Sequence, residues 1–345
     1  MHKQRNAINF SGENIYAGID VHLKHWTVTI LTETRFHKKF TQPSDPSVLS
    51  SYLHTNFPGA TYHSVYEAGF CGVWAHYELL KMKVNNIVVN PADVPTTQKE
   101  KLQKTDVRDS GKLARSLRAG ELVSIHTPSI STMEARSLVR TRSCIVKDLT
   151  RMKQRIKSFL YLHGISYPDE FEKSYTHWSK RFMQWLHQIE LTTAEGKEAL
   201  CLLIRSAEEL RKILLDATRR IRALSKDEKY REDFHLICTV PGIGLITGMT
   251  FLTEIEDIKR FYNTDKLAGF VGLVPTCHNS GPKEENGEMT FRGQSQIKTM
   301  LIESAWTAAR IDPALCQSYA KLIHRMQANK VIIKIARKLL NRIYF

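Results

Sequence analysis

Closely spaced strand signals near the start of the chain constrain its fold more than any other feature. Residues 16–20, 25–31 and 36–41 are separated by short polar connections, which predicts an antiparallel meander of three strands. The segments that follow are predicted as a helix over 46–56, a strand over 60–67, a helix over 73–83 and a strand over 86–91. Three strands followed by alternating helices and strands are typical of an α/β domain.

Four acidic residues stand at the ends of these predicted elements. Asp20 ends the first strand, Glu67 ends the fourth, and Asp106 and Asp109 stand three residues apart at the start of a predicted helix. Carboxylate oxygens are the ligands that Mg²⁺ and Mn²⁺ prefer, and two such ions can activate a nucleophile and stabilise the leaving oxygen of a phosphodiester. One such acid alone is most often a helix cap or a surface charge. The four together predict the metal site of an RNase-H-like fold.

The charge of the chain indicates a polyanionic partner. It carries 50 Lys and Arg against 35 Asp and Glu, a net charge of +15, which favours nucleic acid before an anionic membrane. Lys104 and Arg108 flank Asp106 and are candidate phosphate contacts. The sequence has neither an apolar run long enough to span a membrane nor a signal peptide, so we expect a cytoplasmic protein without a membrane partner.

Two long basic helices are predicted in the middle of the chain. One spans 131–163, with Ser131 or Thr132 as its N-cap, and the other spans about 193–224. The excess of basic over acidic residues is largest here, with 24 Lys and Arg against 16 Asp and Glu over 111–235. Amphipathic helices of this length predict an antiparallel coiled-coil arm that binds RNA, joins two copies of the chain, or does both.

A short glycine motif follows the arm. Residues 240–244, Val-Pro-Gly-Ile-Gly, are typical of the hairpin in a helix-hairpin-helix element. In such a hairpin Gly242 and Gly244 would let backbone N–H groups approach a DNA phosphate at the start of a helix. A plain turn is an equally good interpretation of the motif taken alone.

Ser280 is the candidate nucleophile of the last third of the chain. It lies in a polar, glycine-bearing segment over 276–291, which is predicted as a loop or a hairpin. A serine that attacks a phosphodiester keeps the bond energy in a phosphoserine link, so strands can be rejoined without ATP. Arg292 and Lys298 follow and are candidate contacts to the same phosphate. An ordinary loop serine is the alternative interpretation.

These motifs together resemble a known family. In this order and spacing the chain resembles insertion-sequence transposases of the IS110 type, the bridge-RNA-guided DNA recombinases with a DEDD catalytic domain, from about Tyr16 to Leu340. The motifs that carry the resemblance are Gly18-Ile19-Asp20-Val21, Tyr66-Glu67-Ala68, Lys104-Thr105-Asp106-x-x-Asp109, Pro241-Gly242-Ile243-Gly244, Phe270-Val271-Gly272-Leu273-Val274-Pro275, Ser280-Gly281 and Arg292-Gly293.

The resemblance implies three domains with different functions along the chain. It implies a RuvC-like DEDD catalytic domain over 1–127, a basic coiled-coil arm over 128–230, and a mostly helical transposase domain over 231–345 that carries Ser280 as nucleophile. The acids would hold Mg²⁺ or Mn²⁺ at a composite site completed by a second protomer. The implied partners are donor and target double-stranded DNA, a structured noncoding guide RNA, and other copies of the chain in a dimer or tetramer, in the nucleoid of a prokaryote.

Two other functions remain open at this point. The same acids could serve a RuvC-like, metal-dependent DNA junction endonuclease that uses water as the nucleophile, with Ser280 incidental. A non-catalytic scaffold that only binds nucleic acid is the third interpretation. Variants of Ser280 and of the acids would separate the three.

Overall fold

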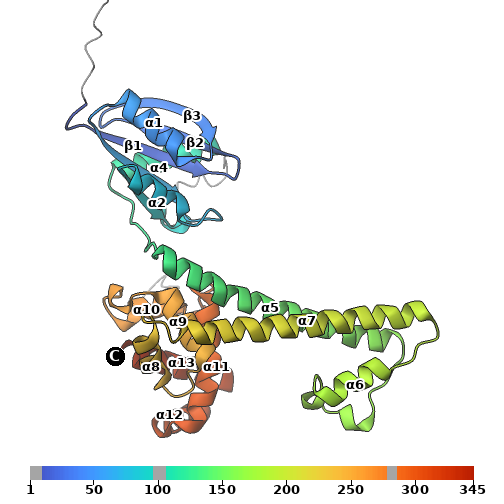
Figure 1. Ribbon diagram of the computed structural model, residues 1–345. Coiled ribbons are helices and arrows are strands. Elements are labelled where there is room, and N and C mark those ends of the chain that lie inside the picture. Colours follow the sequence, from blue (N-terminus) through green and yellow to red (C-terminus); the bar gives the residue numbers. More distant parts are fainter. Residues whose placement is uncertain (1–9, 96–105, 278–285) are drawn as a thin grey trace, which may run out of the picture. The chain divides into compact units, whose positions relative to one another are not determined.

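The computed structural model of the protein describes residues 10–95, 106–277 and 286–345. The chain divides into two compact units, Met1–Thr127 and Pro128–Phe345 (Figure 1). The first holds a mixed sheet with helices, and the described part of the second is mostly helical, which confirms the predicted fold class of an α/β domain followed by helical regions. The further division into an arm and a C-terminal domain stays a prediction, because both fall within the second unit.

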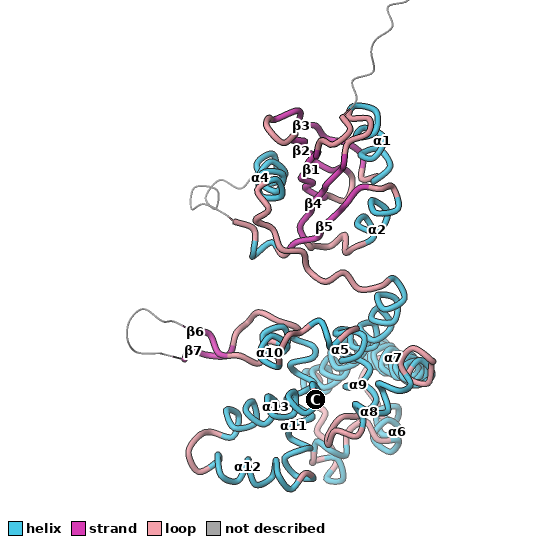
Figure 2. Tube along the Cα trace, turned by 90° about the vertical axis from the view of Figure 1, so that its left-hand side faces the viewer, coloured by secondary structure: helices cyan, strands magenta, loops and turns pink. Residues whose placement is uncertain are grey.

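A five-stranded sheet forms the centre of the first unit, in the order β3-β2-β1-β4-β5 (Figure 2). Its strands are β1 (Asn14–Val21), β2 (His25–Leu31), β3 (Phe36–Pro43), β4 (Thr61–Glu67) and β5 (Val84–Val89). The first three strands are antiparallel neighbours, as their short connections predict, whereas β4 pairs with β1 and β5 pairs with β4 in parallel. The central strands are buried on both faces, so helices must cover both.

The faces of this sheet are covered by α1 (Pro46–Asn56), α2 (Trp74–Lys81) and α4 (Asp106–Arg118). Helix α4 lies on one face, and α1 and α2 lie on the other (Figure 2). A 3₁₀ turn, Pro91–Asp93, follows β5. Helix α1 begins at Pro46 because the Asp45 carboxylate accepts a hydrogen bond of 2.8 Å from the Ser47 N–H and proline fixes the first helical φ.

The predicted arm consists of two long antiparallel helices, α5 (Ile130–Leu162) and α7 (Ala194–Leu224), which lie side by side (Figure 1). The N-cap of α5 is Ser129 rather than Ser131 or Thr132, since the Ser129 hydroxyl accepts a hydrogen bond from the Thr132 N–H at 3.3 Å. The extended backbone of Ser129 turns its hydroxyl towards the first helical turn.

The tip of the arm holds a small aromatic subdomain that the sequence patterns did not predict. It consists of α6 (Lys180–Gln188) and two 3₁₀ turns, Asp169–Phe171 and Ser174–Thr176. Phe182 is fully buried there, with its ring in contact with Phe171 and Trp185. These short, aromatic-rich turns lack the helical periodicity that identifies the long helices.

A helical core makes up the rest of the second unit. Its elements are α8 (Arg231–Cys238), α9 (Leu245–Ile255), a 3₁₀ turn (Ile258–Arg260), α10 (Thr264–Val271), α11 (Ser295–Ile311), α12 (Pro313–Ile323), α13 (Ala328–Tyr344) and a hairpin of β6 (Pro275–Cys277) and β7 (Asn286–Met289). One apolar cluster joins these helices, with Phe251, Leu301 and Ile335 among its buried members. In the described part of the chain, no helix has the length and apolar character needed to cross a membrane.

Candidate active site

Asp20 and Glu67 stand at the same edge of the sheet. Asp20 is the next-to-last residue of β1, and Glu67 is the last residue of β4. These strands are parallel neighbours with Ile19 opposite Tyr66, so their carboxyl ends point in the same direction. The strand register therefore brings together two acids that are far apart in the sequence.

Helix α4 crosses β1 at Gly18, and this close approach brings Asp109 to the same edge. A Cβ atom at position 18 would lie 2.1 Å from the Ser110 carbonyl oxygen and 2.4 Å from the Ala114 nitrogen. Any larger residue would push the helix away from the sheet. The Ser110 hydroxyl also shares a buried hydrogen bond of 3.0 Å with the Thr29 hydroxyl of β2. Asp109 precedes Ser110 and is fixed by both contacts.

Asp20, Glu67 and Asp109 line one pocket of about 140 Å³. Asp106 is the first residue of α4, about one turn before Asp109, and its side chain is not among those described. Among the described side chains, no three His, Cys, Asp or Glu residues lie close enough together to make a metal site on their own. The lining acids nevertheless offer only carboxylate oxygens, so their chemistry fits a hard divalent cation such as Mg²⁺ or Mn²⁺.

Basic side chains that the sequence patterns did not reveal stand beside these acids. The His22 Nε2 lies 3.2 Å from the Asp20 Oδ2. Burial, and then the nearby Arg115, lower the pKa of Lys39, while Asp20 and Asp109 act in the opposite direction. His22 could have been found from its position two residues after Asp20. Lys39 could not, because its position depends on strand pairing: it lies opposite Thr29 in the β2–β3 pair, and Thr29 contacts Ser110 of α4.

Cys71 also lines the pocket, but its thiol is a poor nucleophile at neutral pH. Burial raises the pKa of the Cys71 thiol, so the thiol stays protonated at neutral pH. Only the thiolate attacks or binds metal well. The acids are therefore the reactive feature of this pocket.

Gly242 and Gly244 lie in the turn between α8 and α9, which is the order of elements predicted for a helix-hairpin-helix. Gly242 has a φ of +86°, and a Cβ atom there would lie 2.4 Å from the Ser304 carbonyl oxygen of α11. Gly242 is thus needed for packing. Gly244 precedes α9 and has open space where a side chain would be, so it is the glycine that a phosphate could approach.

Arg292 and Lys298 stand at the base of the β6–β7 hairpin. A Cβ atom on Gly293 would lie 2.7 Å from the Gly272 Cα, so the two ends of the hairpin segment cross at a pair of glycines. The Lys298 ammonium donates a hydrogen bond of 3.0 Å to the Thr290 carbonyl and fixes this crossing. The side chain of Arg292 is exposed beside it. Lys298 thus has a structural contact in addition to its predicted role.

Some predicted site residues fall outside the residues and side chains that the structure describes. Ser280 and Lys104 lie outside the described residues, and the side chain of Arg108 is not described either. In the sequence, Ser280 falls between the paired strands β6 and β7. The roles of these residues remain predictions.

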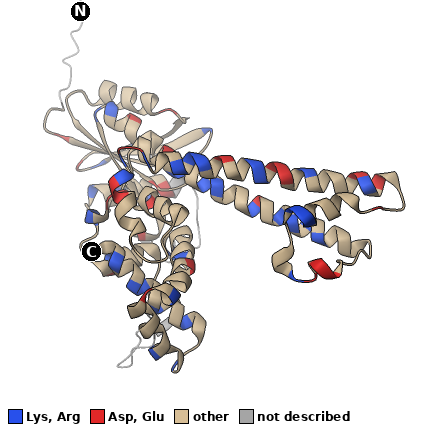
Figure 3. Ribbon diagram, turned by 60° about the horizontal axis from the view of Figure 1, so that its bottom comes forward, with Lys and Arg blue, Asp and Glu red and all other residues tan. Residues whose placement is uncertain are grey.

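Some basic side chains of the arm form contacts within the protein. Arg136 and Arg140 of α5 contact the buried carboxylate of Glu254 on α9, and Arg142 donates a hydrogen bond of 2.9 Å to the Thr218 hydroxyl of α7. Acidic residues are interspersed among the basic ones on the two long helices (Figure 3). Helix α5 carries eight Lys and Arg against two Asp and Glu, and α7 carries seven against five. The charge available to a nucleic acid is therefore smaller than the count of basic residues indicates.

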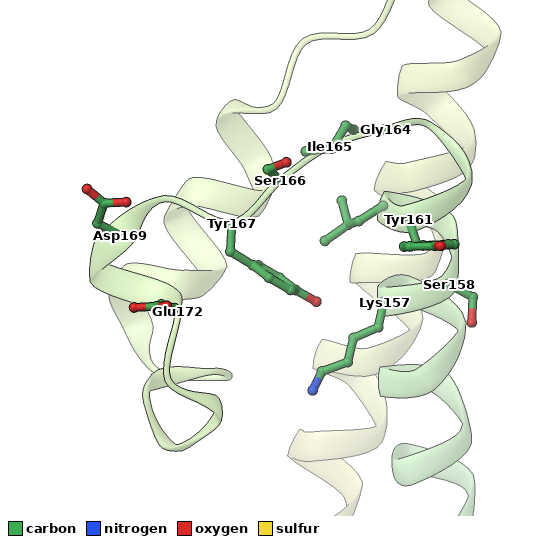
Figure 4. A pocket seen from close by; sticks show the side chains of 10 residues that line it. Lys157, Ser158, Tyr161, Gly164, Ile165, Ser166, Tyr167, Asp169 and Glu172 are labelled. Carbon is green, nitrogen blue, oxygen red and sulfur yellow. The ribbon is translucent and has the colours of Figure 1, made fainter.

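A second pocket, of about 820 Å³, lies at the tip of the arm, lined by residues of α5 and of the segment that follows it (Figure 4). Lys157 and Tyr167 point into it. It contains none of the predicted site residues, and its lining mixes one cation with two carboxylates, Asp169 and Glu172. This mixture does not identify a ligand class.

Comparison with known proteins identifies the family. A model described as "Transposase IS116/IS110/IS902 family" matches residues 234–320, and a model of DEDD transposases of the IS110 type, described as "Transposase", matches residues 17–164. The second match includes Asp20, Glu67, Asp106 and Asp109, and the first includes Ser280.

Curated relatives agree with these matches. A putative transposase of Sinorhizobium fredii, y4qE, is 31% identical over 70% of this chain and 57% of its own length. The transposase for insertion sequence element IS1533 of Leptospira borgpetersenii is 24% identical over 85% of this chain and 84% of its own length. The pilin gene-inverting protein of Moraxella lacunata is 27% identical over 70% of this chain and 65% of its own length. The chain thus spans less than two thirds of the first and third of these relatives.

The two models match separate segments that together cover most of the chain, and the segment matched by the DEDD model contains the pocket lined by Asp20, Glu67 and Asp109. The chain belongs to the IS110 family of DEDD transposases.

Proposed function

We propose that this chain is a DNA transposase and site-specific recombinase that cleaves and rejoins DNA with the help of a structured noncoding guide RNA. The observation that carries the proposal is the pocket shared by Asp20, Glu67 and Asp109. Three carboxylates at one sheet edge, in a chain with a net charge of +15, suit metal-assisted chemistry on a phosphodiester. The names of the relatives, which include transposases and a gene-inverting protein, support DNA rearrangement as the outcome.

The side chains of the pocket have distinct proposed roles. Asp20, Glu67 and Asp109, with Asp106, would hold one or two Mg²⁺ or Mn²⁺ ions. Such an ion, when bound, neutralises charge on the phosphodiester and lowers the pKa of an attacking hydroxyl. The contact between His22 and Asp20 would orient the Asp20 carboxylate. Lys39 and Arg115 would lie within reach of the negatively charged backbone.

Ser280 is the proposed nucleophile. Its oxygen would form a bond to phosphorus and lose its proton, while the bond from phosphorus to the deoxyribose oxygen breaks and that oxygen gains a proton. A hydroxyl of a second DNA end would then reverse the exchange and release the serine. Each exchange replaces one phosphate ester by another, so no ATP is required.

Strand cleavage by protein purified with its bound RNA, in the presence of element-end DNA and Mg²⁺, tests the role of the acids. The variants Asp20→Asn, Glu67→Gln and Asp109→Asn should bind DNA but lose cleavage. Glu78→Gln is the matched control, because Glu78 lies in the same unit and forms an exposed pair with Lys81. Cleavage at the wild-type rate by all three pocket variants would show that the acids are not needed for cleavage and would overturn the proposed metal site. DNA binding without cleavage by the wild type would leave the binding scaffold as the interpretation.

The variant Ser280→Ala tests the nucleophile. We expect wild-type protein to form a covalent adduct with labelled DNA that survives denaturation, and Ser280→Ala to form none and to cleave nothing. Retained cleavage by Ser280→Ala would favour the hydrolytic junction endonuclease. Sequencing of RNA that copurifies with the protein tests the guide: one discrete RNA is expected, and a heterogeneous cellular mixture would contradict the guided mechanism.

A further inference from the structure

The last two helices of the chain present positive charge with little to neutralise it. Residues 313–345 contain seven Lys and Arg and no Asp or Glu. Arg337 and Arg342 pair with Asp265 and Asp312, which lie outside this segment. The other five have exposed side chains and, within the described parts of the chain, no ion pair: Lys321, Arg325, Lys330, Lys334 and Lys338. We call these five the α12–α13 basic face.

Three of these cations are regularly spaced because they lie on the amphipathic helix α13. Its apolar side is buried, with Val331, Ile335 and Leu339 fully enclosed. Lys330, Lys334 and Lys338 follow at intervals of four residues and so form one stripe, with about 6 Å of helix between successive lysines. The Lys338 ammonium donates a hydrogen bond of 2.8 Å to the Ser318 hydroxyl, which joins the stripe to α12.

We infer that the α12–α13 basic face binds the sugar-phosphate backbone of duplex DNA. This inference rests on the proposed function, since it adds a DNA-holding surface to the recombinase. Cations without protein carboxylates as partners release counterions from DNA when they bind phosphate, which is a favourable, salt-dependent contribution to affinity.

Three observations favour duplex DNA over RNA as the occupant. No aromatic residue lies between Lys330 and Lys338, whereas recognition of unpaired RNA bases uses aromatic stacking. The packed helices α12 and α13 are joined by only four residues, 324–327, as in helix-turn-helix elements that present their second helix to the major groove. Exposed Gln327 and Asn329 at the start of α13 are side chains that can contact base edges there.

The packing of α11 places this face on the same rigid body as the helix-hairpin-helix turn. Gly242 of that turn approaches the Ser304 carbonyl oxygen of α11, and α13 buries its apolar side in the cluster that contains Leu301 of α11. A duplex held by the basic face would therefore keep a fixed relation to Gly244. Two contact points on one duplex fix its orientation as well as its position.

Titration of a fluorescently labelled duplex of random sequence at several salt concentrations tests the inference. The test variant is Arg325→Gln/Lys330→Gln/Lys334→Gln, because the side chains of these three residues make no hydrogen bond or ion pair within the described residues. The control is Lys81→Gln/Lys212→Gln/Arg220→Gln, which removes the same charge from three side chains already paired with carboxylates. Circular dichroism confirms that both variants are folded.

The test variant should bind the duplex about tenfold or more weakly at low salt, and the slope of log affinity against log salt should fall by about three. The control should lose much less affinity. A wild-type slope in the test variant would overturn the inference. Loss of affinity for a structured RNA hairpin, with duplex binding intact, would also overturn it and assign the face to RNA. Neither outcome bears on the acids, since strand cleavage by the pocket variants tests the proposed function separately.

Discussion

The guanidinium of Arg140 holds the carboxylate of Glu254 through two hydrogen bonds, of 2.6 and 2.8 Å. Glu254 is buried on α9, and Arg136 adds a second contact to it at 3.4 Å between Nε and Oε2. Arg136 also donates a hydrogen bond of 3.0 Å to the Thr253 carbonyl. This network joins the base of α5 to the helical core through one buried acid.

The variant Glu254→Ala should therefore destabilise the second unit. Removing one partner from a buried, hydrogen-bonded ion pair leaves an uncompensated charge, and because Arg140 is half exposed we expect a loss of about 2 to 3 kcal/mol in the free energy of unfolding. Glu209→Ala breaks the exposed pair with Lys212 and should cost less than about 1 kcal/mol. Urea denaturation of both variants measures the difference. Equal stabilities would show that the contacts of Glu254 with Arg136 and Arg140 add no net stability.

The second prediction concerns the contact between α4 and β1. Gly18→Ala places a methyl group against backbone atoms of Ser110 and Ala114, so the helix must move and Asp109 with it. We expect a loss of about 1 to 3 kcal/mol of stability and a loss of DNA cleavage at temperatures where the variant is still folded.

Gly111→Ala is the matched control, because it lies in the same helix. Its Cβ atom would meet the Arg115 Nη1 at 3.5 Å and the Thr29 Oγ1 at 3.8 Å, which are ordinary contacts. Alanine favours a helix over glycine by about 1 kcal/mol, so this variant should be as stable as the wild type or more stable. If Gly18→Ala cleaves DNA normally, the close approach does not position Asp109.

The strands and helices that were predicted correctly are those that local features of the sequence determine. Apolar runs and short connections predicted the five strands of the sheet, and the helix over 46–56 has the predicted bounds because Asp45 and Pro46 mark its start. The edge shared by Asp20 and Glu67 was predictable, since both residues end strands. The role of Gly18 was not predictable, because a single sequence does not show which glycine lies against the backbone of another element.

Other features depend on contacts that no local pattern encodes. Arg136 and Arg140 are indistinguishable in sequence from solvent-exposed arm cations, yet they bind Glu254, a residue of a distant helix. Asp20 and Asp109 influence the pKa of Lys39 because β3 pairs with β2 so that Lys39 lies opposite Thr29. The helix α12 was missed because it is short and separated from α11 by the single residue Asp312. Such features require the fold before they can be identified.

The third prediction concerns stability at acidic pH. Asp312 caps α12 by accepting a hydrogen bond from the Leu315 N–H, and its oxygens also accept from Arg342. The Arg342 hydrogen bonds, followed by that of Leu315, hold the pKa of Asp312 below its ordinary value. A lowered pKa in the folded state means that the carboxylate stabilises the fold above the pKa of the unfolded chain. That stabilisation is lost as pH falls through the lower, folded-state pKa.

The variant Asp312→Asn isolates this effect, since asparagine is as good an N-cap but carries no charge. At neutral pH the wild type should be the more stable of the two, and the difference should disappear as the pH is lowered below about 4. Thermal unfolding of both proteins across this range measures it. A difference that stays constant with pH would mean that the charge of Asp312 contributes nothing.

The fourth prediction separates packing from DNA contact in the turn between α8 and α9. Gly242→Ala should cost at least about 2 kcal/mol of stability, because φ is positive there and the new Cβ atom would lie 2.4 Å from the Ser304 carbonyl oxygen. Gly244→Ala meets no atom within 4 Å and has a negative φ, so its stability should stay within about 0.5 kcal/mol of the wild type. Its methyl group would nevertheless block a phosphate from the start of α9, and duplex binding should weaken. Unchanged duplex affinity in a folded Gly244→Ala protein would show that this turn serves packing alone.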